Sequence, residues 1–118
     1  MDRYLKDQHI QLYEMNELKT DIYIENGKIN VKKYDNRLGH QLFMHDNITI
    51  ESIKNCFELR AIPRNRMNIN EILNRLSLKE YNAYDIIKAT HGISTDDFFW
   101  FKFDDENIEY KDIAIRNV

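Results

Sequence analysis

Two short runs of alternating apolar and polar residues flank an Asn-Gly dipeptide near the amino end of the chain. The runs are DIYIE at 21–25 and KINVK at 28–32, and the dipeptide is Asn26-Gly27. Asn-Gly readily adopts positive φ at both central positions of a two-residue hairpin turn. The pattern therefore predicts a β-hairpin in which Ile24 opposes Ile29 and one face is apolar.

A further alternating run precedes the hairpin. Residues 9–13, HIQLY, alternate in the same way, and residues 14–17 are suited to a turn before the hairpin begins. This run predicts an additional strand, so the amino-terminal part is either a β-hairpin or a three-stranded sheet. The apolar face requires a helix to cover it, and the opposite face of the hairpin carries Tyr23 and Asn30.

From Thr49 onward the apolar spacing changes to three and four residues, the period of an amphipathic helix. Three helices are expected: one from about residue 50 that ends before Pro63, one over 69–76 and one over 83–90.

Residues suited to capping precede each of these helices. Thr49 or Asn47 can cap the first, Asn68 stands three residues before Glu71 in a capping-box arrangement, and Asn82 opens the third. Gly92 stands where a left-handed residue is expected to end that third helix.

The carboxyl-terminal part is rich in aromatic residues. The run FFWFKF at 98–103 has strong β propensity and follows a turn at 94–97. Residues 104–107 are then predicted to be a hairpin loop, and residues 108–113 a short second strand. Strands at both ends with helices between them predict an α+β fold with a carboxyl-terminal aromatic β-hairpin.

Composition supports one soluble domain over residues 1–118. Apolar residues form 42% of the 118 residues and charged residues 31%, with three Gly and one Pro, which excludes a disordered chain. No apolar run reaches the roughly 18 residues that a membrane helix needs. The charged amino terminus has no signal-peptide pattern, and the lone Cys56 cannot form an internal disulfide. We expect a small acidic protein, of net charge −3, in the cytoplasm.

No motif for metal binding or catalysis is present. The histidines, His9, His40, His45 and His91, do not have zinc-site spacing, and Cys56 lies on the apolar stripe of a helix, as a buried thiol would. There is no glycine-rich phosphate loop, nucleophile elbow or kinase signature. We therefore expect no cofactor, no metal and no catalytic residues. An enzyme with an unfamiliar site would instead need a pocket with converging titratable groups.

A segment rich in arginine joins the first two predicted helices. Arg60, Arg64 and Arg66 surround Pro63, which stiffens the turn. Their guanidinium groups could present forked hydrogen-bond donors to phosphates or to carboxylates of a partner. The alternative is internal: such arginines also cap helix carbonyls or pair with nearby acids.

The aromatic run has two faces, and acidic residues flank it. Alternation directs Phe99, Phe101 and Phe103 one way and Phe98 and Trp100 the other. This second pair belongs either to a second buried face or to an exposed interface hot spot. The candidate partner-binding residues are Arg60, Arg64, Arg66, Asp96, Asp97, Trp100, Asp104, Asp105 and Glu106.

Residues 56–100 resemble the region that precedes the catalytic core in HipA-like serine/threonine kinases of Gram-positive bacteria. The matching residues are Arg60, Ile62, Pro63, Arg66, Leu76, Leu78, Gly92, Ser94, Asp97 and Trp100. The kinase core is absent, because only 18 residues follow Trp100. The resemblance therefore implies a recognition or regulatory module without kinase activity. In size and character the chain is also similar to phage-borne inhibitors of host defence, including anti-CRISPR proteins.

Two classes of function follow. The first is a phage or mobile-element accessory protein that binds and inhibits or regulates a host protein, such as a nucleic-acid-binding protein whose basic site the acidic stretch would occupy. The second is a DNA-binding regulator with a helix-turn-helix at residues 68–91. Its would-be recognition helix offers few groups for reading bases and carries Asp85, so direct binding to nucleic acid is the less favoured alternative.

Overall fold

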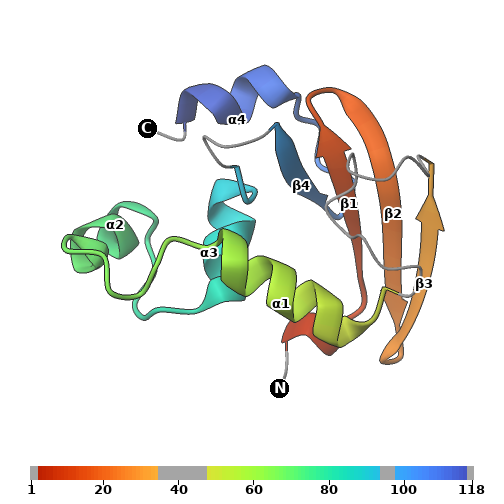
Figure 1. Ribbon diagram of the computed structural model, residues 1–118, viewed down its shortest axis with the longest axis horizontal. Coiled ribbons are helices and arrows are strands. Elements are labelled where there is room, and N and C mark those ends of the chain that lie inside the picture. The colour runs from red at the N-terminus through yellow and green to blue at the C-terminus, as the bar shows by residue number, and fades with distance from the viewer. Residues whose placement is uncertain (1–2, 35–47, 94–97, 117–118) are drawn as a thin grey trace.

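The computed structural model describes residues 3–34, 48–93 and 98–116 of the chain. Its elements in chain order are η1 (Arg3–Leu5), β1 (Gln8–Glu14), β2 (Glu17–Glu25), β3 (Lys28–Lys33), α1 (Ile50–Arg60), α2 (Ile69–Arg75), α3 (Ala83–Thr90), β4 (Phe99–Phe103) and α4 (Tyr110–Arg116). The strands form one antiparallel sheet in the order β3-β2-β1-β4 (Figure 1).

The amino-terminal strands follow the predicted pattern. In the β2–β3 hairpin Glu25 pairs with Lys28 and Ile24 with Ile29, and both turn residues have positive φ, 53° at Asn26 and 75° at Gly27. The additional strand is also confirmed, because β1 pairs with β2 along its whole length. Alternation and one turn dipeptide thus determine three of the four strands.

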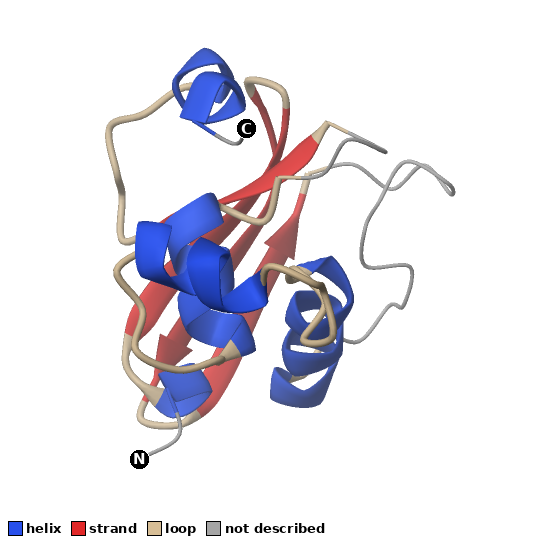
Figure 2. Cartoon of the chain, turned by 90° about the vertical axis from the view of Figure 1, so that its left-hand side faces the viewer, coloured by secondary structure: helices blue, strands red, loops and turns tan. Residues whose placement is uncertain are grey.

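One face of the sheet packs against α1 and α3, as Figures 1 and 2 show. Buried side chains of the strands meet the buried side chains of these two helices, and the rings of Phe57 and Phe101 lie edge to face with centroids 5.0 Å apart. The members of this core that are fully buried are Ile10, Leu12, Ile22, Ile24, Ile53, Phe57, Ile86, Ile87 and Phe101. The helices therefore cover Ile22 and Ile24 of the hairpin, whereas Val31 on the outer strand remains exposed.

The helix boundaries confirm some predicted caps and correct others. Thr49 caps α1 in a capping box with Ser52, and the Asn82 side chain accepts a hydrogen bond from the Asp85 amide at the start of α3. The capping box predicted at Asn68 is wrong, because this residue is not extended and its side chain makes no capping hydrogen bond.

The end of α3 also differs from the prediction. The left-handed C-cap is His91, with φ of 60°, one residue before Gly92. Gly92 is nevertheless required, because its φ is 67° and a Cβ there would lie 2.9 Å from the Phe101 ring.

The carboxyl-terminal hairpin is the largest correction. Residues 108–113 were predicted as a strand, but residues 110–113 belong to α4 and 108–109 to the loop before it, and β4 pairs with β1 instead. The Asp112 carboxylate accepts a hydrogen bond from the Glu109 amide, which favours a helix start. The Tyr110 amide donates to the side chain of Asn16, in the distant β1–β2 turn, and Ile113 is buried. This tertiary context outweighs the local alternation.

The outer edge of β4 is closed by groups from three other segments. The Arg60 guanidinium donates to the Phe99 carbonyl, the Phe101 amide donates to the His91 carbonyl, and the Phe103 amide donates to the Glu106 carboxylate. Closure of an edge strand prevents it from pairing with other chains. The α+β class predicted from the sequence is thus confirmed, and within the described residues no helix is long and apolar enough to cross a membrane.

Candidate functional site

The face of the sheet opposite α1 and α3 carries polar and aromatic side chains. Alternation along β1 directs His9, Gln11 and Tyr13 away from the core, and the register places Tyr23 opposite His9 and Asp21 opposite Gln11. Lys102 of β4 flanks Gln11 on the other side. We define the polar sheet face as His9, Gln11, Tyr13, Asp21, Tyr23, Tyr34 and Lys102.

Asp21 is the centre of a hydrogen-bond network on this face. Its carboxylate accepts hydrogen bonds from the Tyr34 hydroxyl at 2.6 Å and the Gln11 amide at 2.9 Å, and it lies 2.7 Å from Nε2 of His9. Burial acts to raise the pKa of Asp21, but the hydrogen bonds from Tyr34, His9 and Gln11 together lower it below its usual value. Asp21 is therefore an ionised carboxylate that fixes three side chains.

His9 connects this network to the turn after β4. Its Nδ1 atom lies 2.8 Å from the Asp105 carboxylate, opposite the Nε2 contact with Asp21. The imidazole also stacks on the Tyr23 ring, with centroids 4.0 Å apart and planes inclined by only 8°. The Tyr23 ring is thus held in place although 46% of the residue surface is exposed.

The lysines on and beside this face lie over aromatic rings. Lys102 Nζ is 4.5 Å from the centroid of the Tyr13 ring, and that ring stacks on Trp100. Lys32 Nζ is 5.0 Å from the centroid of the Tyr34 ring. Such cation–π contacts keep both cations beside exposed or half-buried tyrosines rather than freely extended.

The three arginines proposed as partner-binding residues are in different environments. Arg60 is half-buried and donates from Nε to the Gly92 carbonyl at 2.9 Å and from Nη2 to the Phe99 carbonyl at 3.0 Å, so it holds the fold together. Arg64 is exposed and stacks over the Tyr81 ring at 4.3 Å, and Arg66 is exposed as well. Arg60 therefore faces carbonyls of the protein itself, whereas Arg64 and Arg66 lie at the surface.

The acidic candidates after β4 also contact the body of the protein. Asp104 accepts a hydrogen bond from the His9 amide, Asp105 contacts the His9 imidazole, and Glu106 lies 3.1 Å from Nε2 of His91. Asp96 and Asp97 lie outside the described residues. The turn formed by Asp104, Asp105 and Glu106 is thus in contact with two histidines, His9 and His91.

Trp100 is fully buried, with an exposed fraction of 0%. Its ring points away from the core of Phe101 and Phe103, and its indole N–H donates to the Met15 carbonyl at 2.6 Å. Of the two alternatives that the sequence allowed, burial is therefore correct for Trp100, whose ring stacks on Tyr13. Phe98, by contrast, is 53% exposed.

The segment predicted as a helix-turn-helix, residues 68–91, contains α2 and α3. α3 buries Ala83, Tyr84, Ile86 and Ile87, and exposes Lys88 and Ala89. Of the two residues that α3 exposes, Lys88 carries a positive charge and Ala89 is apolar.

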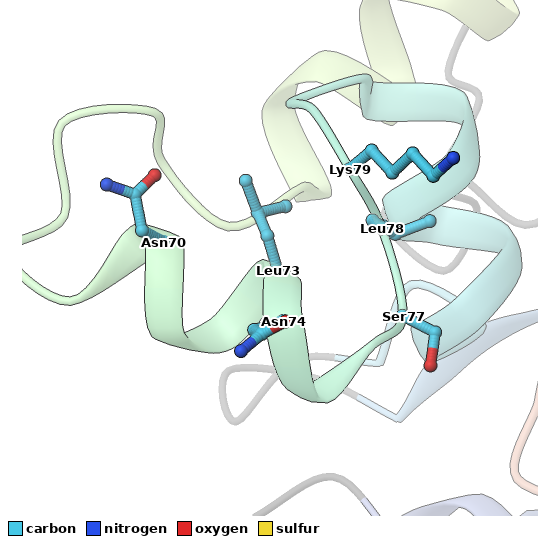
Figure 3. A pocket seen from close by; sticks show the side chains of 6 residues that line it. All are labelled: Asn70, Leu73, Asn74, Ser77, Leu78 and Lys79. Carbon is cyan, nitrogen blue, oxygen red and sulfur yellow. The ribbon is translucent and has the colours of Figure 1, made fainter.

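A hollow of about 500 Å³ lies beside α2 (Figure 3). It is lined by Asn70, Leu73, Asn74, Ser77, Leu78 and Lys79. Among the described residues that line it, Lys79 is the titratable one. In the part of the chain that the structure describes, no cluster of His, Cys, Asp or Glu is arranged to hold a metal ion.

No protein-family model, no curated protein and no solved structure matches this chain.

The sequence did not identify the polar sheet face as a candidate site. His9 and Asp21 were assigned no role, although Tyr23 was predicted on the polar face of the hairpin. A signal was present, because both β1 and β2 carry polar and aromatic residues at every second position opposite their apolar residues. Contacts with Asp105 and Tyr34 depend on the tertiary fold and have no such signal.

Proposed function

We propose that this chain is a macromolecule-binding module without catalysis, and that it binds a protein partner through the polar sheet face. The observation that carries the proposal is the state of Tyr23, which is exposed and yet fixed by stacking on His9. A rigid, exposed aromatic residue loses little side-chain entropy when a partner covers it. Tyrosines are enriched among the residues that dominate binding energy at protein interfaces.

The arrangement of charge favours a protein rather than a nucleic acid. Lys32 and Lys102 are the cations beside the tyrosines, and Asp105 and the ionised Asp21 lie on the same side of the sheet. A surface that binds a nucleic acid is usually positively charged throughout. Mixed charge instead fits a protein surface with an apolar centre that covers Tyr23 and Tyr34, and with a carboxylate facing Lys102.

A finer form of the proposal is that the partner is a host protein and that the chain is a phage or mobile-element inhibitor or regulator, of which anti-CRISPR proteins are examples. Its support is the small size, the net charge of −3 and the lack of catalytic motifs. The DNA-binding alternative has no supporting observation at α3.

The proposal can be tested by affinity capture of the full chain from a lysate of its host. Capture should be performed with and without nuclease at about 0.15 M salt, a physiological ionic strength. We expect one protein to be retained after nuclease treatment, and to be lost when Tyr23 and Tyr34 are both changed to Ser. The proposal would be contradicted if the captured protein were lost after nuclease treatment, or if the double variant retained it as well as the wild type does.

A further inference from the structure

The turn that follows β4 has an unfavourable backbone conformation. Asp104 and Asp105 both have positive φ, 49° and 60°. Residues other than glycine adopt this region at a cost, although Asp and Asn tolerate it better than most. Two backbone contacts with His9 hold the first of these residues: the Asp104 amide donates to the His9 carbonyl, and the His9 amide donates to the Asp104 carboxylate. The second residue depends on a side-chain contact.

That contact is between Asp105 and a histidine that has a carboxylate at each ring nitrogen. Nδ1 of His9 is 2.8 Å from Asp105 Oδ1, and Nε2 is 2.7 Å from Asp21 Oδ1. Neutral imidazole has a single N–H, whereas the imidazolium ion has two. Both contacts can therefore be hydrogen bonds only when His9 is protonated.

Deprotonation should break one specific contact of the two. The Asp21 side chain is 8% exposed and the Asp105 side chain 78% exposed, so water can solvate Asp105 but not Asp21. Loss of a donor costs more at a buried carboxylate. Neutral His9 should thus keep its proton on Nε2, next to Asp21. The lone pair on Nδ1 then faces the Asp105 carboxylate, and the two repel each other.

The groups around His9 consist mainly of acids. Asp21 and Tyr23 face it from β2, Asp104 and Asp105 from the turn after β4, and Lys102 lies two residues before Asp104. Tyr34 reaches it only through Asp21. Lys102 is directed over the Tyr13 ring.

A second histidine provides an internal comparison. Among the described residues, the contact of His91 with a carboxylate is through Nε2, which lies 3.1 and 3.2 Å from the two oxygens of Glu106. One N–H is sufficient for this contact, so neutral His91 can maintain it. The Glu106 end of the turn should therefore remain attached when the Asp105 end is released.

We propose that His9 is a proton-sensitive latch that holds the turn at Asp104–Asp105 against the polar sheet face and releases Asp105 when its proton passes to solvent. The inference rests on the proposed function in one respect: release of Asp105 changes where its carboxylate lies beside the polar sheet face, which a partner would contact. The latch itself belongs to the free protein, so its failure and the failure of the proposed binding function can be distinguished.

The test is an NMR titration of the free, full-length chain between about pH 5 and pH 8, the range in which imidazole changes charge. The His9 ring signals and the amides of Asp105 and Glu106 are followed together. We expect the chemical shift of the Asp105 amide to change with the same midpoint as the signals of the His9 ring, because the side chain of Asp105 leaves the imidazole. The Glu106 amide should keep its protection from hydrogen exchange.

Two variants make the test specific. Asp105→Asn keeps the shape of the side chain and tolerates positive φ, but it removes the charge, so the pH response at residue 105 should be lost. Glu109→Gln, an exposed acid without a histidine contact, should leave that response unchanged. An Asp105 amide that does not respond to His9 titration, or a response that persists in Asp105→Asn, would overturn the latch.

Discussion

On β2, Ile22 is fully buried beneath the helices, whereas its neighbour Tyr23, on the opposite face, has 46% of its surface exposed. The same alternation divides the whole sheet. On the helix side, apolar residues pack into a core, and their burial is the main source of stability. On the other side, charges and aromatic rings are fixed by hydrogen bonds and stacking. The comparison shows that one set of strands can supply a stable core and a rigid surface available to a partner.

The most severe test of this division is Trp100, which points to the same side as the polar sheet face but is fully buried. Trp100→Ala should reduce the free energy of unfolding by about 3–5 kcal/mol, because it leaves a cavity and an unpaired Met15 carbonyl. Denaturant unfolding measures the loss. Phe98→Ala, at the exposed neighbour, serves as the control and should cost less than about 1 kcal/mol. Equal losses in the two variants would show that Trp100 is not part of the buried structure.

Adjacent residues of β2 compare the two faces directly. Ile22→Ala should reduce the free energy of unfolding by about 2–5 kcal/mol, since it removes fully buried methyl and methylene groups. Tyr23→Ala should cost no more than about 1 kcal/mol, because much of the ring is already in water. Thermal or denaturant unfolding of both variants checks the difference. If Tyr23→Ala were the more destabilising, the polar sheet face would be a structural surface rather than a binding one.

Two arginines of the same segment provide a smaller contrast. Arg60→Met should destabilise the protein by about 1–3 kcal/mol, because the carbonyls of Gly92 and Phe99 lose a charged donor. Arg66→Met, at an exposed position, should change the free energy of unfolding by less than about 0.5 kcal/mol. If the unfolding curves of the two variants coincided, Arg60 would not be one of the residues that close the edge of β4.

The smallest effect concerns the ionisation of Tyr34. Its hydrogen bond to Asp21 is the main cause that raises the pKa of Tyr34 to about 12. A raised tyrosine pKa stabilises the folded state below about pH 10, the ordinary value, and this contribution is lost as the pH rises toward 12. Tyr34→Phe should abolish the tyrosinate absorbance step near pH 12, and Tyr110→Phe should retain it. Persistence of the step in Tyr34→Phe would assign it to another tyrosine.

The same hydrogen bond affects Asp21 in the opposite direction. A lowered carboxylate pKa contributes stability above the ordinary value of 3.8, and that stability is lost as the pH falls through the lower value in the folded state. Removal of the Tyr34 hydroxyl should therefore raise the pKa of Asp21 toward its ordinary value and reduce the acid sensitivity of folding.

Local patterns in the sequence were sufficient where neighbouring residues determine the structure. The Asn26-Gly27 turn sets the register of the hairpin, and Thr49 and Asn82 mark the starts of α1 and α3. Each of these features depends on contacts within a few residues, and intrinsic preferences then agree with the final fold.

Long-range contacts explain what the sequence did not predict. α4 begins where Asn16 accepts a hydrogen bond from Tyr110, 94 residues away in sequence. The polar sheet face likewise joins His9 of β1, Asp21 of β2 and Asp105 of the turn after β4. The pairing of β1 with β4 creates this neighbourhood, and neither strand alone specifies it.

The central claim, that the polar sheet face is the binding surface, is tested most directly by comparing capture of the same partner with two matched variants. Tyr23→Ser changes an exposed residue on the polar sheet face, and Leu59→Ser changes one that is 86% exposed on α1. Both variants should fold as the wild type does, as circular dichroism can establish. We predict that Leu59→Ser retains the captured protein, whereas Tyr23→Ser loses at least about tenfold in affinity, as expected for an interface hot spot. Full retention by Tyr23→Ser, or loss by Leu59→Ser alone, would contradict the account and locate the binding surface elsewhere.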